Sequence, residues 1–125
     1  MKVAFFDSHQ FEREVFNSEN KNHAHELVFY DCRLTQEFTG LAHGYDVVCC
    51  FVNDRLDAAT LKRLKENGVK LVALRSAGFN HVDLTAAAKL DLPVVRVPEY
   101  SPYAVAEHTV ALVLTLNRKI HRAYT

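Results

Sequence analysis

Residues 70–80 read KLVALRSAGFN, an apolar run that ends at Leu74 and leaves through a turn containing Gly78. An almost uniformly apolar run is typical of a strand that is covered on both faces, as in parallel sheets. Polar or turn-forming residues also bound four other such runs: Lys2 to Asp7, Leu27 to Tyr30, Val47 to Val52, and Val94 to Val97. The sequence therefore predicts five strands.

Amphipathic stretches fill the gaps between these strands. Apolar residues recur at helical spacing over residues 11–16 and again over residues 61–64, where Asp57 is a good N-cap and Gly68 a C-terminal stop. A shorter helix is predicted from Asp83 to Leu90. The alternation predicts an α/β, flavodoxin-like, doubly wound fold with a five-stranded parallel sheet.

A last helix is predicted to open at Ser101-Pro102, where serine can cap and proline fits the first helical position. From residue 103 to residue 116 it is apolar on more than one face. We therefore expect a neighbour to cover it on more than one side, with part of that neighbour outside these 125 residues.

Composition excludes several functional classes. Fifteen basic residues balance fifteen acidic ones, so no basic excess favours nucleic acid. Neither the short apolar run at the N-terminus nor residues 110–116 reach the length of a signal peptide core or a membrane span. The cysteines, Cys32, Cys49 and Cys50, are odd in number, and neighbours in a strand point to opposite faces, so no disulfide is expected. We expect a cytoplasmic protein of about one domain.

Ligands of such sheets bind beyond the carboxyl ends of the strands, at residues 7–9, 51–54, 75–80 and 98–101. The amides of the turn at 75–80 can form a cradle for an anion such as a small carboxylate. The alternative is a plain turn in which Gly78 only relieves backbone strain. His23 and His25 have a spacing seen in metal sites, but no further ligand motif accompanies them, so no metal is expected. Adjacent Glu107 and His108 diverge on a helix and are not expected to pair.

Several ordered motifs resemble one enzyme family. Residues 73–83 (ALRSAGFNHVD) are similar to a stretch of the D-isomer-specific 2-hydroxyacid dehydrogenases. Residues 51–54 (FVND), 94–102 (VVRVPEYSP), 105–108 (VAEH) and 116–124 (LNRKIHRAY) resemble the D-lactate dehydrogenase branch of that family. The resemblance covers nearly the whole chain.

This resemblance implies NAD as cofactor, and pyruvate and D-lactate as the substrate pair. It implies that the amides of Ser76, Ala77 and Gly78 hold the substrate carboxylate. Tyr100 would lie beside the substrate and the nicotinamide, and Val105 would touch the nicotinamide ring. Without the resemblance, Tyr100 reads as a half-buried aromatic residue at a strand end.

The resemblance also implies what the chain lacks. The family's catalytic arginine and its acid-paired histidine lie downstream, so no catalytic residue is assigned here. The four glycines, at positions 40, 44, 68 and 78, form no Gly-x-Gly-x-x-Gly turn for a pyrophosphate. We expect residues 1–100 to form a substrate-binding domain and residues 101–125 to lead into a nucleotide-binding domain. The chain alone should be inactive, and its last helix should support a dimer.

Two other functions remain open. Receiver domains of two-component systems share this length and fold, and Asp54 follows the third strand near their phosphoacceptor position. Receivers, however, carry paired acids after the first strand and a lysine after the fifth, where this chain has a single Asp7 and residues 96–98 (RVP). A noncatalytic domain that binds a partner through the apolar last helix is the other alternative.

Overall fold

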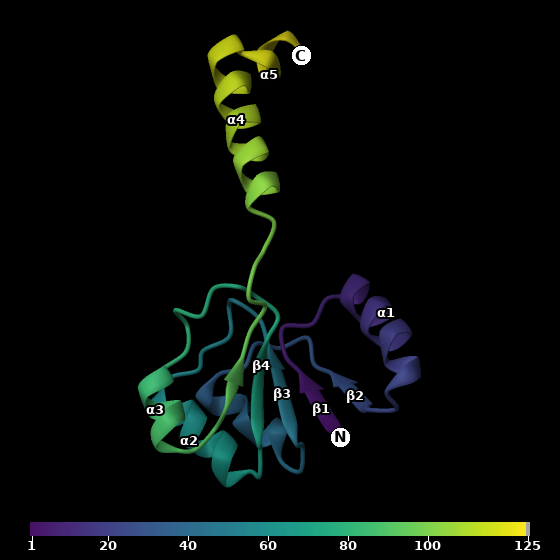
Figure 1. Cartoon of the computed structure of the whole chain (residues 1–125), viewed down its shortest axis with the longest axis vertical. Helices are drawn as coiled ribbons and strands as arrows, with labels where there is room; N and C mark the ends of the chain where they lie inside the picture. Colours follow the sequence, from purple (N-terminus) through teal and green to yellow (C-terminus); the bar gives the residue numbers. More distant parts are fainter. Residues whose placement is uncertain (125) are drawn as a thin grey trace.

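One parallel sheet organises the chain, of which the computed structural model describes residues 1–124. Its strand order is β2-β1-β3-β4-β5 (Figure 1), and every pairing is parallel. The strands are β1 (Lys2–Phe5), β2 (Glu26–Phe29), β3 (Val47–Cys50), β4 (Leu71–Leu74) and β5 (Val94–Val95). This is the flavodoxin-like order, with its switch point between β1 and β3. The predicted fold is therefore confirmed.

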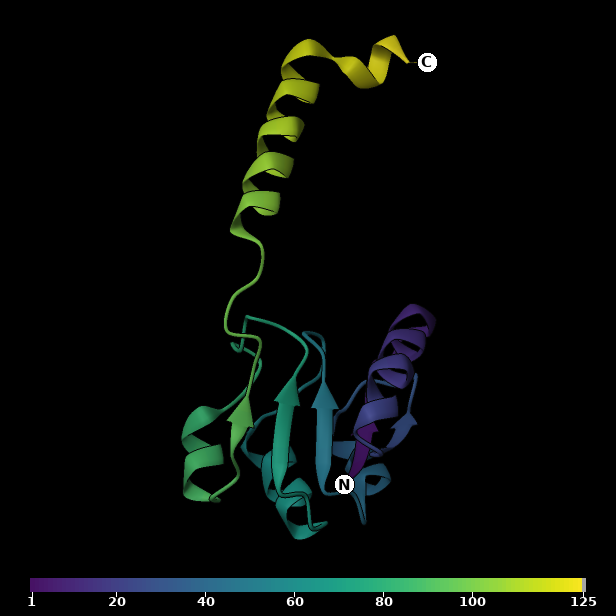
Figure 2. The same cartoon turned by 45° about the vertical axis from the view of Figure 1, so that its right-hand side comes forward.

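Helices cover both faces of the sheet. They are α1 (Gln10–Glu19), η1 (Asn20–Asn22), η2 (Gln36–Ala42), α2 (Ala58–Glu66), α3 (Leu84–Lys89), α4 (Pro102–Arg118) and α5 (Ile120–Ala123). Phe16 of α1 packs on one face, and α2, α3 and η2 pack on the other. Figures 1 and 2 show α1 on the β1–β2 side and the α2–α3 layer on the opposite face.

The two faces divide the core by simple alternation along each strand. Cys50 belongs to the larger cluster, under α2 and α3, whereas Cys49 belongs to the smaller cluster with Phe16. Both thiols are buried, and all three cysteines are free. The prediction that the adjacent cysteines face opposite sides of the sheet is confirmed.

Three strands end two residues earlier than predicted, at Phe5, Cys50 and Val95. Asp7 has a φ of 47°, which is not an extended conformation. After β3, the carboxylate of Asp54 accepts a hydrogen bond from the amide of Phe51 at 2.6 Å. That amide is therefore not available for a hydrogen bond to a neighbouring strand. The backbone of Asp7 and the contact of Asp54 thus account for the early ends of β1 and β3. Strand β2 starts and ends one residue earlier than predicted, and β4 starts one residue later.

The helix caps follow the predicted chemistry. Asp57 accepts a hydrogen bond from the amide of Thr60 at 2.9 Å, and Gly68 turns the chain after α2 with a φ of +92°. Ser101 accepts a hydrogen bond from the amide of Ala104 at 3.3 Å, with Pro102 in the first turn of α4. These local signals correctly predict the starts of α2 and α4.

Helix α4 projects from the carboxyl edge of the sheet on an extended segment (Figures 1 and 2). None of its residues is buried, and six large aliphatic side chains are more than half exposed: Val105, Val110, Leu112, Val113, Leu114 and Leu116. Within residues 1–124, therefore, nothing covers the apolar faces for which we expected a neighbour. No helix in this part of the chain is both long and apolar enough to cross a membrane.

Candidate functional site

The turn after β4 presents free amides and occupied carbonyls. The carbonyl of Ser76 accepts from the amide of Val97 at 3.1 Å, and that of Ala77 accepts from Arg96 Nη1 at 2.9 Å. The carbonyl of Gly78 accepts from Ser76 Oγ at 2.8 Å. None of the amides of Ser76, Ala77 and Gly78 donates a hydrogen bond within residues 1–124. Three consecutive donors are therefore available to an outside acceptor.

Gly78 needs no special backbone conformation. Its φ lies outside the left-handed region, and a Cβ built there would meet no atom within 4 Å. Relief of strain therefore does not explain the glycine, and neither does close packing within the described chain. Within the described chain, the space where a side chain of residue 78 would lie is open.

Arg75 forms the base of this turn, and its side chain is only 6% exposed. The guanidinium donates to the carbonyls of Phe6 and Asp7, each at 3.0 Å, and to that of Cys49 at 3.1 Å. Its Nε pairs with Oε1 of Glu12 at 2.9 Å. Arg75 therefore ties the turn to the ends of β1 and β3, at the switch point of the sheet. The sequence places Arg75 in the turn but does not predict this role, because its partners lie 26 to 69 residues away in the chain and no local motif indicates them.

Tyr100 and Val105 lie together at the start of α4. With Ala104, His108 and Thr109 they line a cavity of about 260 Å³. Tyr100 is 72% exposed, so its interpretation as a half-buried aromatic residue is wrong. The structure thus brings two of the residues singled out by sequence into one hollow. The other three, in the turn, form a second group that Arg96 links to the segment before Tyr100.

Asp54, the residue that suggested a receiver domain, is 2% exposed. Its carboxylate oxygens accept the amides of Leu34 and Phe51, each at 2.6 Å. Burial raises the pKa of Asp54, although both amides act to lower it. A phosphoacceptor must be open to its donor, so this carboxylate serves the structure of the loop instead.

The histidine motifs do not form sites. The rings of His23 and His25 stack with centroids 5.9 Å apart, and no group of three or more potential metal ligands occurs within residues 1–124. His108 and Glu107 form no ion pair in that part of the chain. Of these residues, only His108 borders the candidate site, at the cavity beside Tyr100.

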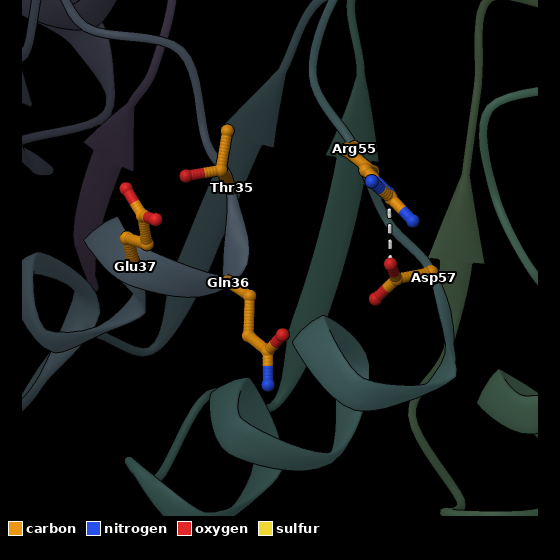
Figure 3. A pocket seen from close by; sticks show the side chains of 5 residues that line it. All are labelled: Thr35, Gln36, Glu37, Arg55 and Asp57. Carbon is orange, nitrogen blue, oxygen red and sulfur yellow. Dashed lines mark ion pairs between the residues drawn. The ribbon is translucent and has the colours of Figure 1, made fainter.

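A larger cavity, of about 330 Å³, lies at the start of η2 and in the loop that precedes α2. Figure 3 shows Arg55 and Asp57 facing each other, while Glu37 points away from them. Nε of Arg55 and Oδ2 of Asp57 form an ion pair at 2.8 Å. Gln36 and Thr35 also line the cavity. The polar groups do not converge on one point, so they form no catalytic constellation.

Known proteins resemble this chain over nearly its whole length. The family model described as "D-isomer specific 2-hydroxyacid dehydrogenase, catalytic domain" matches residues 3–125. The 2-hydroxyacid dehydrogenase homolog 1 of Schizosaccharomyces pombe is 56% identical over 99% of this chain and 37% of its own length.

Two solved structures give the same result. The apo-structure of D-lactate dehydrogenase from Escherichia coli matches with a TM-score of 0.89 and 48% identity, over 99% of this chain and 39% of that one. The NAD complexed form of a D-isomer specific 2-hydroxyacid dehydrogenase from Lactobacillus delbrueckii ssp. bulgaricus matches with a TM-score of 0.76 and 32% identity, over 96% of this chain and 37% of that one.

This chain thus spans less than two fifths of the length of these relatives. The match confirms the resemblance that the motifs indicated, and it replaces the receiver interpretation. This chain belongs to the D-isomer specific 2-hydroxyacid dehydrogenases, a family of oxidoreductases, and corresponds to the N-terminal part of the family.

Proposed function

We propose that this chain is the substrate-binding part of an NAD-dependent D-lactate dehydrogenase, which reduces pyruvate to D-lactate and catalyses the reverse reaction. The observation that carries the proposal is the row of free amides at the turn after β4. The turn lies at the carboxyl edge of the sheet, where ligands of this fold bind. The names of the relatives in Escherichia coli and Lactobacillus delbrueckii support this substrate class.

The amides of Ser76, Ala77 and Gly78 would bind the carboxylate of the keto acid. Because the carbonyls of these residues are already held by donors, the peptide groups need not reorient when the anion arrives. Preorganised donors cost little conformational entropy and act most strongly where water is excluded. The open position at Gly78 gives the substrate room to approach the backbone.

Tyr100 would lie beside the substrate and the nicotinamide, and Val105 would touch the nicotinamide ring. The tyrosine ring supplies an apolar surface with one hydroxyl to orient a polar ligand, and Val105 supplies an aliphatic contact for the ring. The cavity beside them suits the edge of a nicotinamide, but no Gly-x-Gly-x-x-Gly turn for the pyrophosphate occurs in this sequence. Bound NADH would supply the hydride. We assign no proton donor and no catalytic residue to this chain, and so propose that it is inactive alone.

The same proposal covers domains and partners. Residues 1–100 would form the substrate-binding domain, and residues 101–125 would lead into a nucleotide-binding domain. The uncovered aliphatic side chains of α4 support a dimer formed through this helix.

Three free cysteines fit a reducing compartment, and we propose a cytoplasmic location.

Pyruvate titration of the ¹⁵N-labelled chain, followed by NMR, tests the anion site. We expect the amide signals of Ser76, Ala77 and Gly78 to shift together and to saturate. Ala77→Pro removes the central N–H and should weaken binding about ten-fold. Ala58→Pro is the matched control, since proline is tolerated at the first position of α2. Unmoved signals in the wild-type turn, or unchanged binding by Ala77→Pro, would refute the proposal.

A further inference from the structure

Arg96 connects the turn to the segment that leads to α4. Its Nη1 donates to the carbonyl of Ala77 at 2.9 Å and to those of Val97 and Pro98, each at 3.2 Å. The guanidinium also lies over the ring of Phe79, 5.2 Å from its centroid. One nitrogen therefore binds a carbonyl of the turn, that of Ala77, and two carbonyls of the segment that leads to α4, those of Val97 and Pro98.

Few polar links join that segment to the sheet. Within residues 1–124, every hydrogen bond that joins residues 97–101 to the rest of the sheet domain comes from Arg96 or runs from the amide of Val97 to the carbonyl of Ser76. Tyr100 lies in this segment and is largely exposed. The placement of Tyr100 relative to the sheet thus depends on hydrogen bonds to the carbonyls of Ser76 and Ala77 in the turn.

The two sides of the turn belong to the same peptide groups. The carbonyl of Ala77 and the amide of Gly78 form one planar unit, as do the carbonyl of Ser76 and the amide of Ala77. An anion on such an amide polarises the unit and strengthens the hydrogen bond that its carbonyl accepts. The first unit accepts from Arg96 and the second from the amide of Val97. Occupation of the amides therefore tightens both links to the segment.

The charge of Arg96 favours the same effect. No carboxylate pairs with Arg96 in the described part of the chain, in contrast to Arg75 with Glu12. Three carbonyl oxygens around one nitrogen concentrate negative potential, which a guanidinium balances and a neutral side chain does not. Arg96 thus places a positive charge that no carboxylate neutralises, within the described residues, at the carbonyl of Ala77.

We propose that Arg96 is a positioning residue that couples binding of a carboxylate at residues 76–78 to the placement of Tyr100. This inference rests on the proposed function of the turn. Arg96 does not need to touch the substrate; it acts through the carbonyl of Ala77 and the segment at residues 97–98.

The experiment compares pyruvate titrations of the wild-type chain and Arg96→Met by ¹⁵N NMR. In the wild type, the amides of Glu99 and Tyr100 should shift with the same saturation curve as those of residues 76–78. In Arg96→Met we expect this distant response to disappear and the dissociation constant to rise about ten-fold. Arg63→Met is the control, because Arg63 is another exposed arginine whose guanidinium donates to a backbone carbonyl, that of Gln36, at 3.1 Å.

The outcomes separate the two claims. If residues 76–78 do not respond in the wild type, the proposed anion site is wrong and the coupling fails with it. A wild-type response confined to residues 76–78 refutes the coupling alone, and so does a response of Tyr100 that persists in Arg96→Met. Arg96→Lys is a second variant, which keeps the positive charge but lacks the planar guanidinium. If the charge matters, Arg96→Lys should bind pyruvate more tightly than Arg96→Met does.

Discussion

The guanidinium of Arg75 and the carboxylate of Glu12 form an ion pair between the end of β4 and helix α1, with 2.9 Å between Nε and Oε1. The side chains are 6% and 14% exposed, so neither charge is well solvated alone. Residues 63 positions apart are thereby joined directly beneath the amides that we assign to the substrate.

Arg75→Met tests how much this pair stabilises the fold. The variant leaves the Glu12 carboxylate without its ion-pair partner and the carbonyls of Phe6 and Asp7 without a donor. We therefore expect the free energy of unfolding to fall by about 3 to 5 kcal/mol. Glu12→Gln keeps an acceptor for Arg75 and should cost about 1 to 2 kcal/mol. Urea denaturation measures both. If Arg75→Met is as stable as the wild type, the ion pair does not stabilise the fold.

The sequence predicts the five strands and the helix caps at Asp57 and Ser101, and it makes the turn at residues 75–80 a candidate site. It does not predict the contacts that hold this turn. Periodicity and capping residues such as Asp57 and Ser101 act locally, so their effects can be predicted from neighbours in the chain. The direction of the Arg75 side chain depends on carbonyls brought together only by folding. Likewise, which amides of the turn stay free could not be predicted, because their carbonyls are held by residues 96–97.

Asp54 should give the chain a distinct pH dependence. Because burial raises its pKa in the folded chain, the folded state binds the proton more tightly than the unfolded state, whose pKa is near 3.8. The stability that Asp54 contributes is therefore fully present below that value and is lost as the pH rises through the folded pKa. We expect the deficit of Asp54→Asn relative to wild type to be larger at about pH 4 than at about pH 7.

Urea denaturation across that range measures this deficit. Asparagine offers only one acceptor to the two amides of Leu34 and Phe51, so the variant should be less stable at each pH. A deficit that grows as the pH rises would contradict the assignment.

The thiols should differ sharply in reactivity. Burial raises the pKa of Cys49 to about 11 and raises that of Cys50 well above its ordinary value, whereas Cys32 is partly exposed. At about pH 8, a thiol reagent should modify only Cys32 in the folded chain, and all three cysteines after unfolding. In Cys32→Ser no thiol should react before unfolding. Rapid modification of Cys49 or Cys50 in the native chain would show that these strands open readily.

Removal of α4 tests the proposed division into domains. Since none of its residues is buried, a chain of residues 1–100 should keep the unfolding free energy of the whole chain within about 0.5 kcal/mol. The full chain should self-associate through the exposed aliphatic side chains, and the shortened chain should be a monomer by light scattering. If residues 1–100 fail to fold, the proposed boundary is wrong.

A chimera tests the central claim most directly. Residues 1–125 would replace the matching segment of the Escherichia coli D-lactate dehydrogenase, whose structure aligns with a TM-score of 0.89. The measurement is NADH oxidation at saturating pyruvate, by the chimera and by the isolated chain side by side. We predict turnover by the chimera, slowed by Ala77→Pro, and none by the isolated chain. A folded chimera that does not reduce pyruvate, or turnover by the isolated chain, would contradict the account.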